Sequence, residues 1–364
     1  MSYTVTFGEV MTRFRTPDFK RISQVMPGTV EVSFAGAEAN VAASVALLGG
    51  SARFVTALPD NPIADACIAF LRGIGIDTSA IVRTSGGRMG TYYLEVGANQ
   101  RGSAVIYDRD HSAVGVTPYS AYAWDQIFAD ASRFHVTGIT PAISAAAADA
   151  TLQVVQHARE RGLTVSCDLN FRSKLWRWEP GTPAKELARR VMGKIMEHVN
   201  LVIANEGDAA DVLDIHAGSS DVETGSLEIE SYPKVAQTIV SRYPAVEMVA
   251  ITLRESVSAS HNRWGAMLYT AADQRARFAP QQDGAYCPHE ITNIVDRVGA
   301  GDSFGAGLMC ALDDPAYTSD VDGALSFAVA ASALCHSVEG DFNLISRKEV
   351  ETLARGNAAG RVQR

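Results

Sequence analysis

The chain has 364 residues, 47% of them hydrophobic and 20% charged, and its formal net charge at pH 7 is −9. That length allows one large α/β domain or about two domains of ~150 residues. The acidic balance argues against a nucleic-acid partner, because phosphate contacts need clustered Lys and Arg. We also expect no membrane partner, because no apolar run reaches the ~18 residues of a transmembrane helix. Five scattered cysteines and an N-terminus without signal-peptide features predict a cytoplasmic location.

Short apolar runs alternate with helical patterns over most of the chain. Strands are predicted at residues 4–8, 52–57, 133–136, 164–168, 201–205 and 248–253. Helices are predicted at residues 39–48, 62–72, 145–161, 184–198, 234–242 and 328–336. Strands that alternate with helices favour parallel pairing through crossover connections. We therefore expect an α/β fold with a mostly parallel central sheet and helices on both faces.

Two regions interrupt this alternation. Residues 30–34 alternate apolar and polar side chains, and residues 88–96 and 103–109 predict a hairpin of half-exposed strands. We expect segments of about 10–35 and 86–115 to form a small β-sheet lid on a single domain that spans residues 1–350. The acidic segment 217–231 is predicted to be a surface loop, and residues 351–364 a C-terminal tail that frays after Arg355.

The strongest local signal is a glycine turn, Asp-Arg-Val-Gly-Ala-Gly-Asp at residues 296–302, which opens a helix of small residues. The first N–H groups of a helix are unpaired and lie at the positive end of its dipole, which suits a phosphate group. Gly299 and Gly301 let the backbone approach that anion closely. A carboxylate at Asp302 would repel phosphate, so its expected role is general base toward an attacking hydroxyl. The alternative for Asp302 is an ordinary helix N-cap.

Two other phosphate-binding motifs are excluded. The chain has no GxxxxGK[ST] motif, so the turn is not a P-loop. Glycines at 299, 301 and 305 do not match GxGxxG, which disfavours an NAD-dependent oxidoreductase.

The turn resembles the C-terminal signature Asp-Thr-x-Gly-Ala-Gly-Asp of the ribokinase-like (PfkB) carbohydrate kinases. The resemblance implies a Rossmann-like core of the ribokinase type with a small β-sheet lid. It also implies that Gly299, Ala300 and Gly301 form an anion hole and that Asp302 is the catalytic base. Arg297 stands where the family signature has Thr.

Residues 33–49 resemble the first signature of the same family, Gly-Gly-x-x-x-Asn followed by a buried helix. Gly36 and Asn40 match this signature, whereas Ala35 stands in place of its first glycine. The resemblance implies that Gly36 lies near the sugar and that Asn40 binds sugar hydroxyls. Taken alone, Asn40 is equally explained as a cap at the start of the helix.

Further segments resemble one branch of the family, the 2-keto-3-deoxygluconate kinases. Residues 87–95 and 105–113 resemble the substrate lid of that branch, and residues 168–176 resemble its Asp-x-Asn-x-Arg-x-x-Leu-Trp segment. The chemistry agrees, because a guanidinium group can bind the carboxylate of an acidic sugar bidentately. The alternative for each arginine is a solvated surface charge. The resemblance implies that the substrate is bound by Tyr93, Tyr107, Arg109, Asn170 and Arg172.

The nucleotide side depends on shorter segments. Asn205 and Asp208 lie in a segment that resembles the family's Asn-x-x-Glu, which organises Mg²⁺ and phosphate. The shorter Asp208 is expected to act through water. Thr252 and Arg254, at the end of the predicted strand 248–253, are candidate ATP contacts, with a structural loop as the alternative. The resemblance implies that residues 328–336, followed by 340–343, wall the adenine site, with a packed core helix as the alternative.

These observations lead to one hypothesis and two alternatives. The hypothesis is ATP-dependent phosphorylation of 2-keto-3-deoxygluconate (2-dehydro-3-deoxygluconate) at the C6 hydroxyl, giving 2-keto-3-deoxy-6-phosphogluconate. ATP and Mg²⁺ are the expected cofactors, with a monovalent cation as an option. Exposed lid strands predict a homodimer or a higher homo-oligomer. The alternatives are a PfkB-type kinase of a neutral sugar, of the fructokinase or ribokinase type, and a catalytically inactive sugar-sensing relative.

Overall fold

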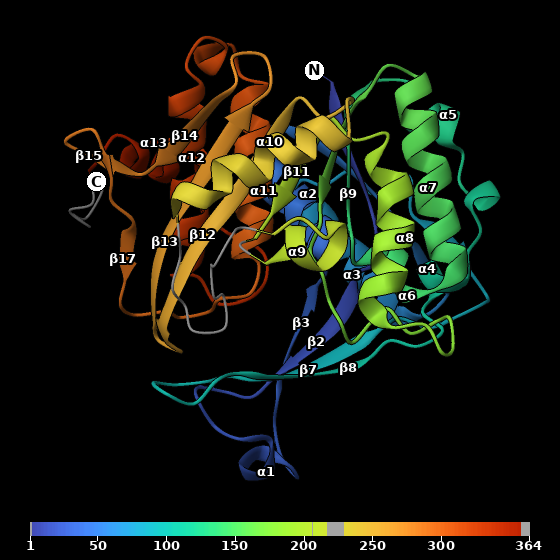
Figure 1. Cartoon of the computed structure of the whole chain (residues 1–364). Coiled ribbons are helices and arrows are strands. Elements are labelled where there is room, and N and C mark those ends of the chain that lie inside the picture. The colour runs from blue at the N-terminus through green and yellow to red at the C-terminus, as the bar shows by residue number, and fades with distance from the viewer. Residues whose placement is uncertain (1, 206, 217–228, 358–364) are drawn as a thin grey trace.

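The computed structural model describes residues 2–205, 207–216 and 229–357. In this part of the chain a nine-stranded sheet runs in the order β14-β13-β12-β11-β10-β9-β1-β4, with β17 paired to β13 (Figure 1). Its strands are β1 (Tyr3–Phe7), β4 (Ser51–Val55), β9 (Ala131–Thr137), β10 (Thr164–Asp168), β11 (Leu201–Ala204), β12 (Met248–Ser258), β13 (His261–Thr270), β14 (Arg275–Ala279) and β17 (His289–Ile291).

The sheet is parallel from β4 to β12, which confirms the fold class expected from the alternation of strands and helices. β11 is buried along its whole length, so it reads in the sequence as a short apolar run. The other edge is antiparallel, because β12 folds back on β13, and β13 also pairs with β14 and β17. The sequence analysis did not predict this edge. The predicted strand 248–253 also continues to Ser258, because its polar end pairs across the β12–β13 hairpin.

Helices cover both faces of the sheet, and each face has its own hydrophobic core (Figure 1). One face carries α7 (Ala145–Glu160), α8 (Ala184–Met196), α9 (Asp208–Leu213) and α10 (Tyr232–Arg242). The other face carries α2 (Ala37–Leu47), α3 (Pro62–Gly73), α11 (Ala300–Leu312) and α12 (Val321–Cys335). The last helix, α13 (Arg347–Ala354), packs on α12.

The two helices that follow the sequence signatures, α2 and α11, pack directly against each other. Both are built largely of small residues, and Ala39, Ala42 and Ala43 of α2 are completely buried. Small side chains let the two backbones approach closely, so each face buries apolar area without bulky residues. The packing therefore brings the start of one signature helix beside the start of the other.

Four strands form a separate sheet, which lies below the main sheet in Figure 1 and which we call the lid. Its order is β3-β2-β7-β8, and all four strands fall within the segments 10–35 and 86–115. Met11, Tyr92 and Leu94 lie in the small hydrophobic core under its inner face. The strands of the lid are β2 (Met11–Arg15), β3 (Glu31–Ala35), β7 (Thr91–Glu95) and β8 (Ala104–Asp108).

Smaller elements complete the described chain. They are two short strand pairs, β5 (Ala57–Pro59) with β6 (Val82–Thr84) and β15 (Gln281–Gln282) with β16 (Ala285–Tyr286), the helices α1 (Ile22–Val25), α4 (Ala113–Val116), α5 (Trp124–Ile127) and α6 (Thr140–Ile143), and the 3₁₀ turns η1 (Tyr119–Ala121), η2 (Ile229–Ser231) and η3 (Pro315–Tyr317). Helix α13 includes residues 351–354, which the sequence analysis assigned to the tail, because Val350 is buried in the core. Residues 217–228 of the predicted loop and 358–364 of the tail lie outside the described residues. No helix in the described ranges is both long enough and apolar enough to cross a bilayer.

Candidate active site

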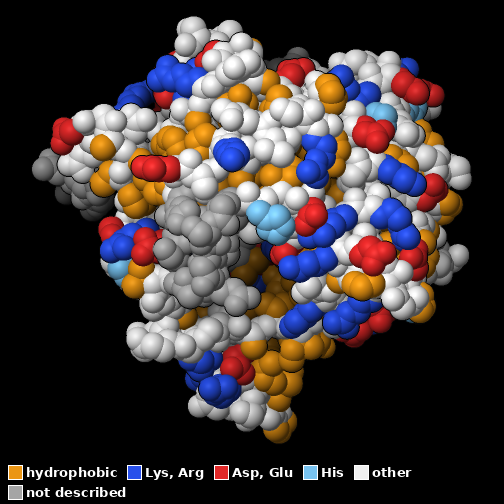
Figure 2. All heavy atoms as spheres, in the orientation of Figure 1, with side chains coloured by type: hydrophobic (Ala, Val, Ile, Leu, Met, Phe, Trp, Pro, Cys, Tyr) orange, Lys and Arg blue, Asp and Glu red, His pale blue; other side chains and the backbone are white. Residues whose placement is uncertain are grey.

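A cavity of about 380 Å³ lies between the lid and the carboxyl-terminal edge of the parallel strands. α/β proteins bind ligands at this edge, because strand ends and helix N-termini converge there. Figure 2 shows the hollow near the lid, with Lys and Arg side chains along part of its rim. Of the residues predicted from sequence, the structure brings these to the cavity wall: Gly36, Asn40, Tyr107, Arg109, Asn170, Arg172, Asn205, Asp208, Thr252, Arg254, Gly299, Ala300, Gly301 and Asp302.

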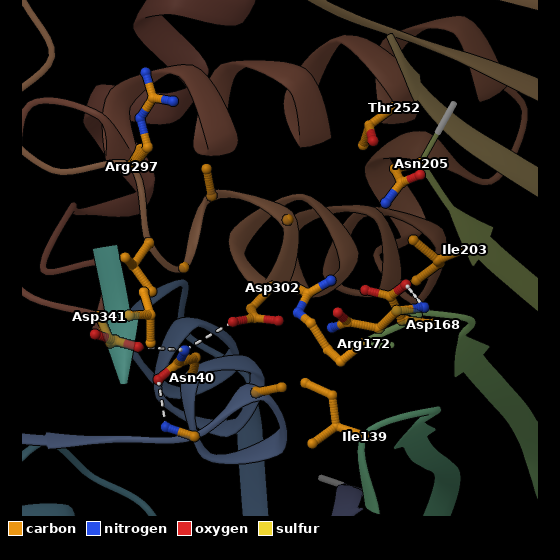
Figure 3. A pocket seen from close by; sticks show the side chains of 18 of the residues that line it. Asn40, Ile139, Asp168, Arg172, Ile203, Asn205, Thr252, Arg297, Asp302 and Asp341 are labelled. Atoms are coloured by element: carbon orange, nitrogen blue, oxygen red, sulfur yellow. Dashed lines mark hydrogen bonds between the residues drawn. The ribbon is translucent and has the colours of Figure 1, made fainter. Parts of the chain in front are cut away.

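Asp302 faces the cavity from the first turn of α11 (Figure 3). Its side chain is buried, and the Nδ2 of Asn40 donates a hydrogen bond to its Oδ2 at 2.7 Å. The pKa of Asp302 is raised to about 7, mainly by burial; the charges of Asp341 and Glu38 contribute to the rise, whereas the Asn40 hydrogen bond and Arg172 oppose it. A carboxyl group that titrates near neutral pH can accept a proton from a hydroxyl and release it again.

The glycine turn requires glycine at position 299 for two reasons. The φ of Gly299 is 86°, in the left-handed region, and a Cβ there would lie 2.2 Å from the backbone oxygen of Asp341. At Gly301 an added Cβ would meet nothing within 4 Å, so the backbone faces open space. The first helical hydrogen bond runs from Ser303 N to Gly299 O. The amides that precede Ser303 in the turn therefore have no partner within the helix. Because Gly299 is the N-cap, Asp302 does not cap this helix.

Asn40 connects the start of α2 to two carboxylates. Its Oδ1 accepts a hydrogen bond from the amide of Gly36, and its Nδ2 also lies 3.4 Å from Asp341 Oδ2. The N-cap of α2 is Gly36, so Asn40 is not the helix cap that its position alone would suggest. Gly36 in turn must be glycine, because a Cβ would lie 2.1 Å from the backbone oxygen of Glu9. The first signature therefore fixes both the backbone near the cavity and the amide beside Asp302.

Behind the glycine turn, Arg13 lies between two buried aspartates. Its Nη1 donates to Asp341 Oδ1 at 2.5 Å, and its Nη2 donates to Asp296 Oδ2. The hydroxyl of Tyr92 donates to the same Asp341 oxygen at 2.7 Å. Burial raises the pKa of Asp341, and the positive charge of Arg13 opposes that rise. Buried ion pairs therefore join the lid to the segments that contain Asp296 and Asp341.

Tyr107 lines the cavity, but Tyr93 does not. Successive side chains of a strand point to opposite faces, and in β7 the residue that faces the cavity is Tyr92. Tyr93 instead stacks on Phe14 at the outer face of the lid, with ring centroids 5.1 Å apart. The structure therefore places Tyr92, and not the predicted Tyr93, on the cavity wall. The resemblance located the segment but did not decide which face of the strand is buried.

Arg109 is held on the cavity wall and is not a solvated surface charge. Its Nη2 donates to Oε2 of Glu9, a residue that follows β1, and both side chains are buried. Its guanidinium lies over the ring of Tyr107, 5.6 Å from the centroid. Its Nε is buried and has no hydrogen-bond partner among the described residues, so a donor remains for a ligand.

Asn170 and Arg172 follow β10 and reach the same cavity. Asn170 has a left-handed φ of 37°, and its buried Oδ1 has no partner in the described part of the chain. Figure 3 shows Arg172 inside the cavity, near both Asp302 and Asp168. Burial raises the pKa of Asp168 well above its usual range, and the charge of Arg172 opposes this rise. Arg172 is thus a cation placed among carboxylates at the centre of the site.

Asn205 and Asp208 close the turn between β11 and α9. Asn205 Oδ1 accepts hydrogen bonds from the amides of Gly207 and Asp208 at 2.8 and 3.0 Å. Asp208 accepts from the amides of Asn205 and Phe171 at 3.0 and 3.1 Å. Both oxygens of Asp208 are therefore already hydrogen-bonded to the backbone.

Arginines also line the end of the cavity near β12. Arg297, which replaces the Thr of the family signature, donates to the backbone oxygens of Ser258 and Ala259 at 3.2 and 2.8 Å. The side chain of Arg297 therefore joins the glycine turn to the β12–β13 hairpin. Burial and the nearby Arg254 lower the pKa of Arg297. Two guanidinium groups that repel each other would both be stabilised by a bound polyphosphate.

The carboxylate oxygens in this part of the cavity fit an Mg²⁺ ion that is held mainly by the phosphate oxygens of a bound ligand. Among the described residues, no group of three or more His, Cys, Asp or Glu side chains is placed to hold a metal. Mg²⁺ keeps several waters and usually takes one or two carboxylates together with phosphate oxygens. Asp208 and Asp168 could serve as those carboxylates, Asp208 through water because its oxygens already accept amides.

Comparison with known proteins defines the class to which this fold and site belong. Residues 1–347 match the pfkB family carbohydrate kinases, so the chain belongs to this family. It is 32% identical over 357 residues to the 2-dehydro-3-deoxygalactonokinase of Haloferax volcanii, covering 98% of each protein. It is also similar to the structure of 2-dehydro-3-deoxygluconokinase from Thermotoga maritima, with 41% identity, a TM-score of 0.86 and coverage of 98% and 100%. A putative ribokinase II of E. coli in complex with ATP and Mg²⁺ shares the fold at 20% identity and a TM-score of 0.75, with coverage of 98% and 100%.

The family resemblance found in the sequence is thus confirmed, but sequence reasoning missed several residues in the cavity wall and behind it. Glu9 could have been found, because it is the first acidic residue after a predicted strand, at the edge where ligands bind. The alternation of β7 showed that Tyr92 and Tyr93 lie on opposite faces of the strand, but it did not show which of them faces the cavity. Arg13 and Asp341 gave no local signal, because their 328-residue separation hides the contact that defines both.

Proposed function

We propose that this pfkB-family kinase uses ATP to phosphorylate the C6 hydroxyl of 2-keto-3-deoxygluconate. The observation that carries the proposal is the presence of Arg109 and Arg172 on the wall of the cavity that holds Asp302. A sugar acid brings a carboxylate that a guanidinium can bind, and the buried Nε of Arg109 is a donor without a hydrogen-bond partner among the described residues. The similar kinases named for 2-dehydro-3-deoxy sugar acids support this substrate class.

Asp302 is the base in this mechanism. Its carboxylate accepts the proton of the C6 hydroxyl while the hydroxyl oxygen forms a bond to the γ-phosphorus and the bond to the ADP oxygen breaks. Asn40 orients the carboxylate through its 2.7 Å hydrogen bond. The product is 2-keto-3-deoxy-6-phosphogluconate, and the proton leaves when Asp302 next meets solvent.

The glycine turn and the arginines stabilise negative charge. The first amides of α11 face the position proposed for the transferred phosphoryl group, where preorganised donors are most effective. Arg254 and Arg297 are proposed to bind the phosphates of ATP, with Thr252 and Asn205 beside them. Mg²⁺, when bound, neutralises the charge on the phosphate oxygens. The monovalent cation stays a prediction, which turnover in potassium chloride against tetramethylammonium chloride would check.

We also propose that two copies of the chain associate through the lid. Val32, Phe14, Tyr93 and Ile106 form one row across its four strands, because they are consecutive cross-strand partners. Val32 and Ile106 are 60% and 55% exposed, and Figure 2 shows hydrophobic side chains on the lid below the hollow. Such a row on an exposed sheet is suited to pairing with an identical row about a twofold axis.

We also propose that the protein is located in the cytoplasm.

An ADP-release assay with ATP and Mg²⁺ tests the function. The acceptors are 2-keto-3-deoxygluconate, its galactonate counterpart, fructose and ribose, and the proteins are wild type, Asp302→Asn and the double variant Arg109→Met/Arg172→Met. We expect turnover of the keto-deoxy acids alone, loss of that turnover in both variants, and an intact fold by circular dichroism.

The other outcomes separate the alternatives. Turnover of fructose or ribose, with the sugar acids unused, would establish a neutral-sugar kinase and overturn the role of the arginines. Calorimetric binding of a sugar acid without ADP release would indicate a catalytically inactive sensing protein.

A further inference from the structure

Arg13 is a charged residue of the lid whose side chain ends inside the catalytic core. It lies in the middle of β2 and is 1% exposed, although guanidinium groups are almost never fully buried unless paired. Its partners come from different parts of the chain: Asp296 opens the glycine turn, and Asp341 follows α12. Arg13 is not among the residues that line the cavity. Its role must therefore be exerted through other residues.

The first partner, Asp296, shapes the glycine turn. Its Oδ1 accepts a hydrogen bond from the amide of Val298 at 3.1 Å, inside the turn. Its Oδ2 faces both Arg13 and the amide of Gly340, which lies at 3.3 Å. Asp296 thus joins the turn to the segment that contains Asp341, against whose backbone oxygen Gly299 packs too closely for any side chain.

The second partner, Asp341, leads to the proposed base. One of its oxygens accepts from Arg13 and from the hydroxyl of Tyr92, and the other faces Nδ2 of Asn40. The same Nδ2 donates to Asp302. A continuous series of contacts therefore runs from a lid strand to the carboxylate at the centre of the cavity, as Figure 3 shows for Asp341, Asn40 and Asp302.

Removing the guanidinium would leave two buried carboxylates without a cation. Such groups either take up protons or move toward water, and both responses disturb the hydrogen bonds that they make. The forked guanidinium matches this place because it can serve two carboxylates at once in a fixed geometry. A lysine would restore the charge without the second directed contact.

We propose that Arg13 is a positioning residue, which orients the base Asp302 through Asp341 and Asn40 and the anion-binding turn through Asp296. This inference rests on the proposed function, because it takes Asp302 as the base of a kinase. One consequence is that the glycine turn and Asp302 take up their catalytic arrangement only while the lid strand is packed against them. The lid strand then contributes to the rate of phosphoryl transfer and not only to substrate binding.

Arg15 offers a matched control two residues along the same strand. It points to the same side of β2, is also buried, and pairs with the acidic residues Glu31 and Glu339. Neither of these partners lines the cavity. The side chains of Glu31 and Glu339 are 45% and 54% exposed, so loss of Arg15 removes a less buried ion pair of the same strand without touching the contacts of Asp302.

The test compares kcat, KM for both substrates and melting temperature in wild type, Arg13→Gln, Arg13→Lys and Arg15→Gln. We expect Arg13→Gln to lower kcat at least 100-fold while both KM values stay within threefold. Arg13→Lys should recover about tenfold of that loss, and Arg15→Gln should keep kcat within threefold of wild type. A kcat loss in Arg13→Gln no larger than in Arg15→Gln would overturn the proposal. If Arg13→Gln does not fold, a wild-type kcat in Arg13→Lys overturns it instead.

A second measurement is independent of the sugar. The melting temperatures of Arg13→Gln, Asn40→Ala and the double variant form a cycle between residues that meet only through Asp341. We expect the double variant to lose less than the sum of the two single losses, and additive losses would contradict the series of contacts. If wild type phosphorylates none of the acceptors while the cycle shows coupling, the proposed function fails and the positioning of Asp302 stands.

Discussion

The side-chain amide of Asn40 donates a hydrogen bond of 2.7 Å to the carboxylate of Asp302, although 262 positions separate the two residues. The contact forms because α2 and α11 pack through small buried side chains, which places their first turns together. Each of these helices follows one of the two sequence signatures. The properties of Asp302, the proposed base, therefore depend on a residue from the opposite end of the chain.

The activity should consequently fall on the acid side with a midpoint near the pKa of Asp302, about 7. Only the ionised carboxylate can accept the hydroxyl proton, so kcat declines as the pH drops through this value. In Asn40→Ala the midpoint should move upward by about one pH unit, because a hydrogen bond to a charged group is worth about 1.5 kcal/mol. The measurement is kcat against pH at saturating substrates.

Ser44→Ala is the control for that profile, because Ser44 is buried one turn further along α2 and does not line the cavity. The decline of kcat at acid pH in Ser44→Ala should coincide with that of wild type. An unchanged or lower midpoint in Asn40→Ala would show that the decline of kcat at acid pH does not report the protonation of Asp302.

Asp302→Asn should be inactive and yet more stable than wild type at high pH. The pKa of Asp302 is about 7 in the folded protein and ~3.9 in an unfolded chain, so the folded state holds the proton more tightly. Ionised Asp302 therefore destabilises wild type above pH 7, whereas below about pH 4 the carboxyl is protonated in both states. We expect kcat to fall by ~10³-fold and stability at pH 8 to rise on the order of 4 kcal/mol. Urea unfolding at pH 8 and pH 4 checks that the gain disappears at the lower pH.

Gly299→Ala should cost more stability than Gly49→Ala. Both glycines have nearly the same positive φ, 86° and 90°, so alanine should lose a similar ~1 kcal/mol at each for adopting a left-handed φ. Only at Gly299 would the new Cβ also meet a backbone oxygen, that of Asp341 at 2.2 Å, whereas nothing lies within 4 Å at Gly49. The difference between the two free energies of unfolding isolates the collision. Equal losses would show that the turn adjusts without cost.

The double variant Val32→Glu/Ile106→Glu should convert a lid-paired dimer to monomer. The substitutions place two carboxylates in the exposed apolar row of each copy, where like charges would face each other across the interface. Sedimentation equilibrium measures the mass. Val257→Glu, at a 51% exposed position on the β12–β13 hairpin, should leave the mass unchanged. A wild-type monomer would contradict the proposed dimer outright.

Much of the fold could be predicted because its signals are local. Alternating strands and helices indicated the parallel sheet, and β10 occupies residues 164–168 as expected, because a strand buried on both faces reads as an apolar run. The β12–β13–β14 edge was missed because its strands mix polar and apolar residues, and its pairing depends on partners that are distant or lie across a hairpin. Tyr93 was chosen over Tyr92 because the pattern of a segment does not say which face of a strand meets the core.

The sequence by itself determined the family and the chemical groups of the site. The turn at residues 296–302 and the pair Gly36 and Asn40 are short, local arrangements whose backbone requirements only certain residues satisfy. Tertiary structure alone decided how these groups are charged and oriented. The proximity of Asn40 to Asp302, and the burial of Arg13 between Asp296 and Asp341, arise where segments hundreds of residues apart pack together. Burial and neighbouring charges set a pKa, and neither is encoded in the residues that carry it.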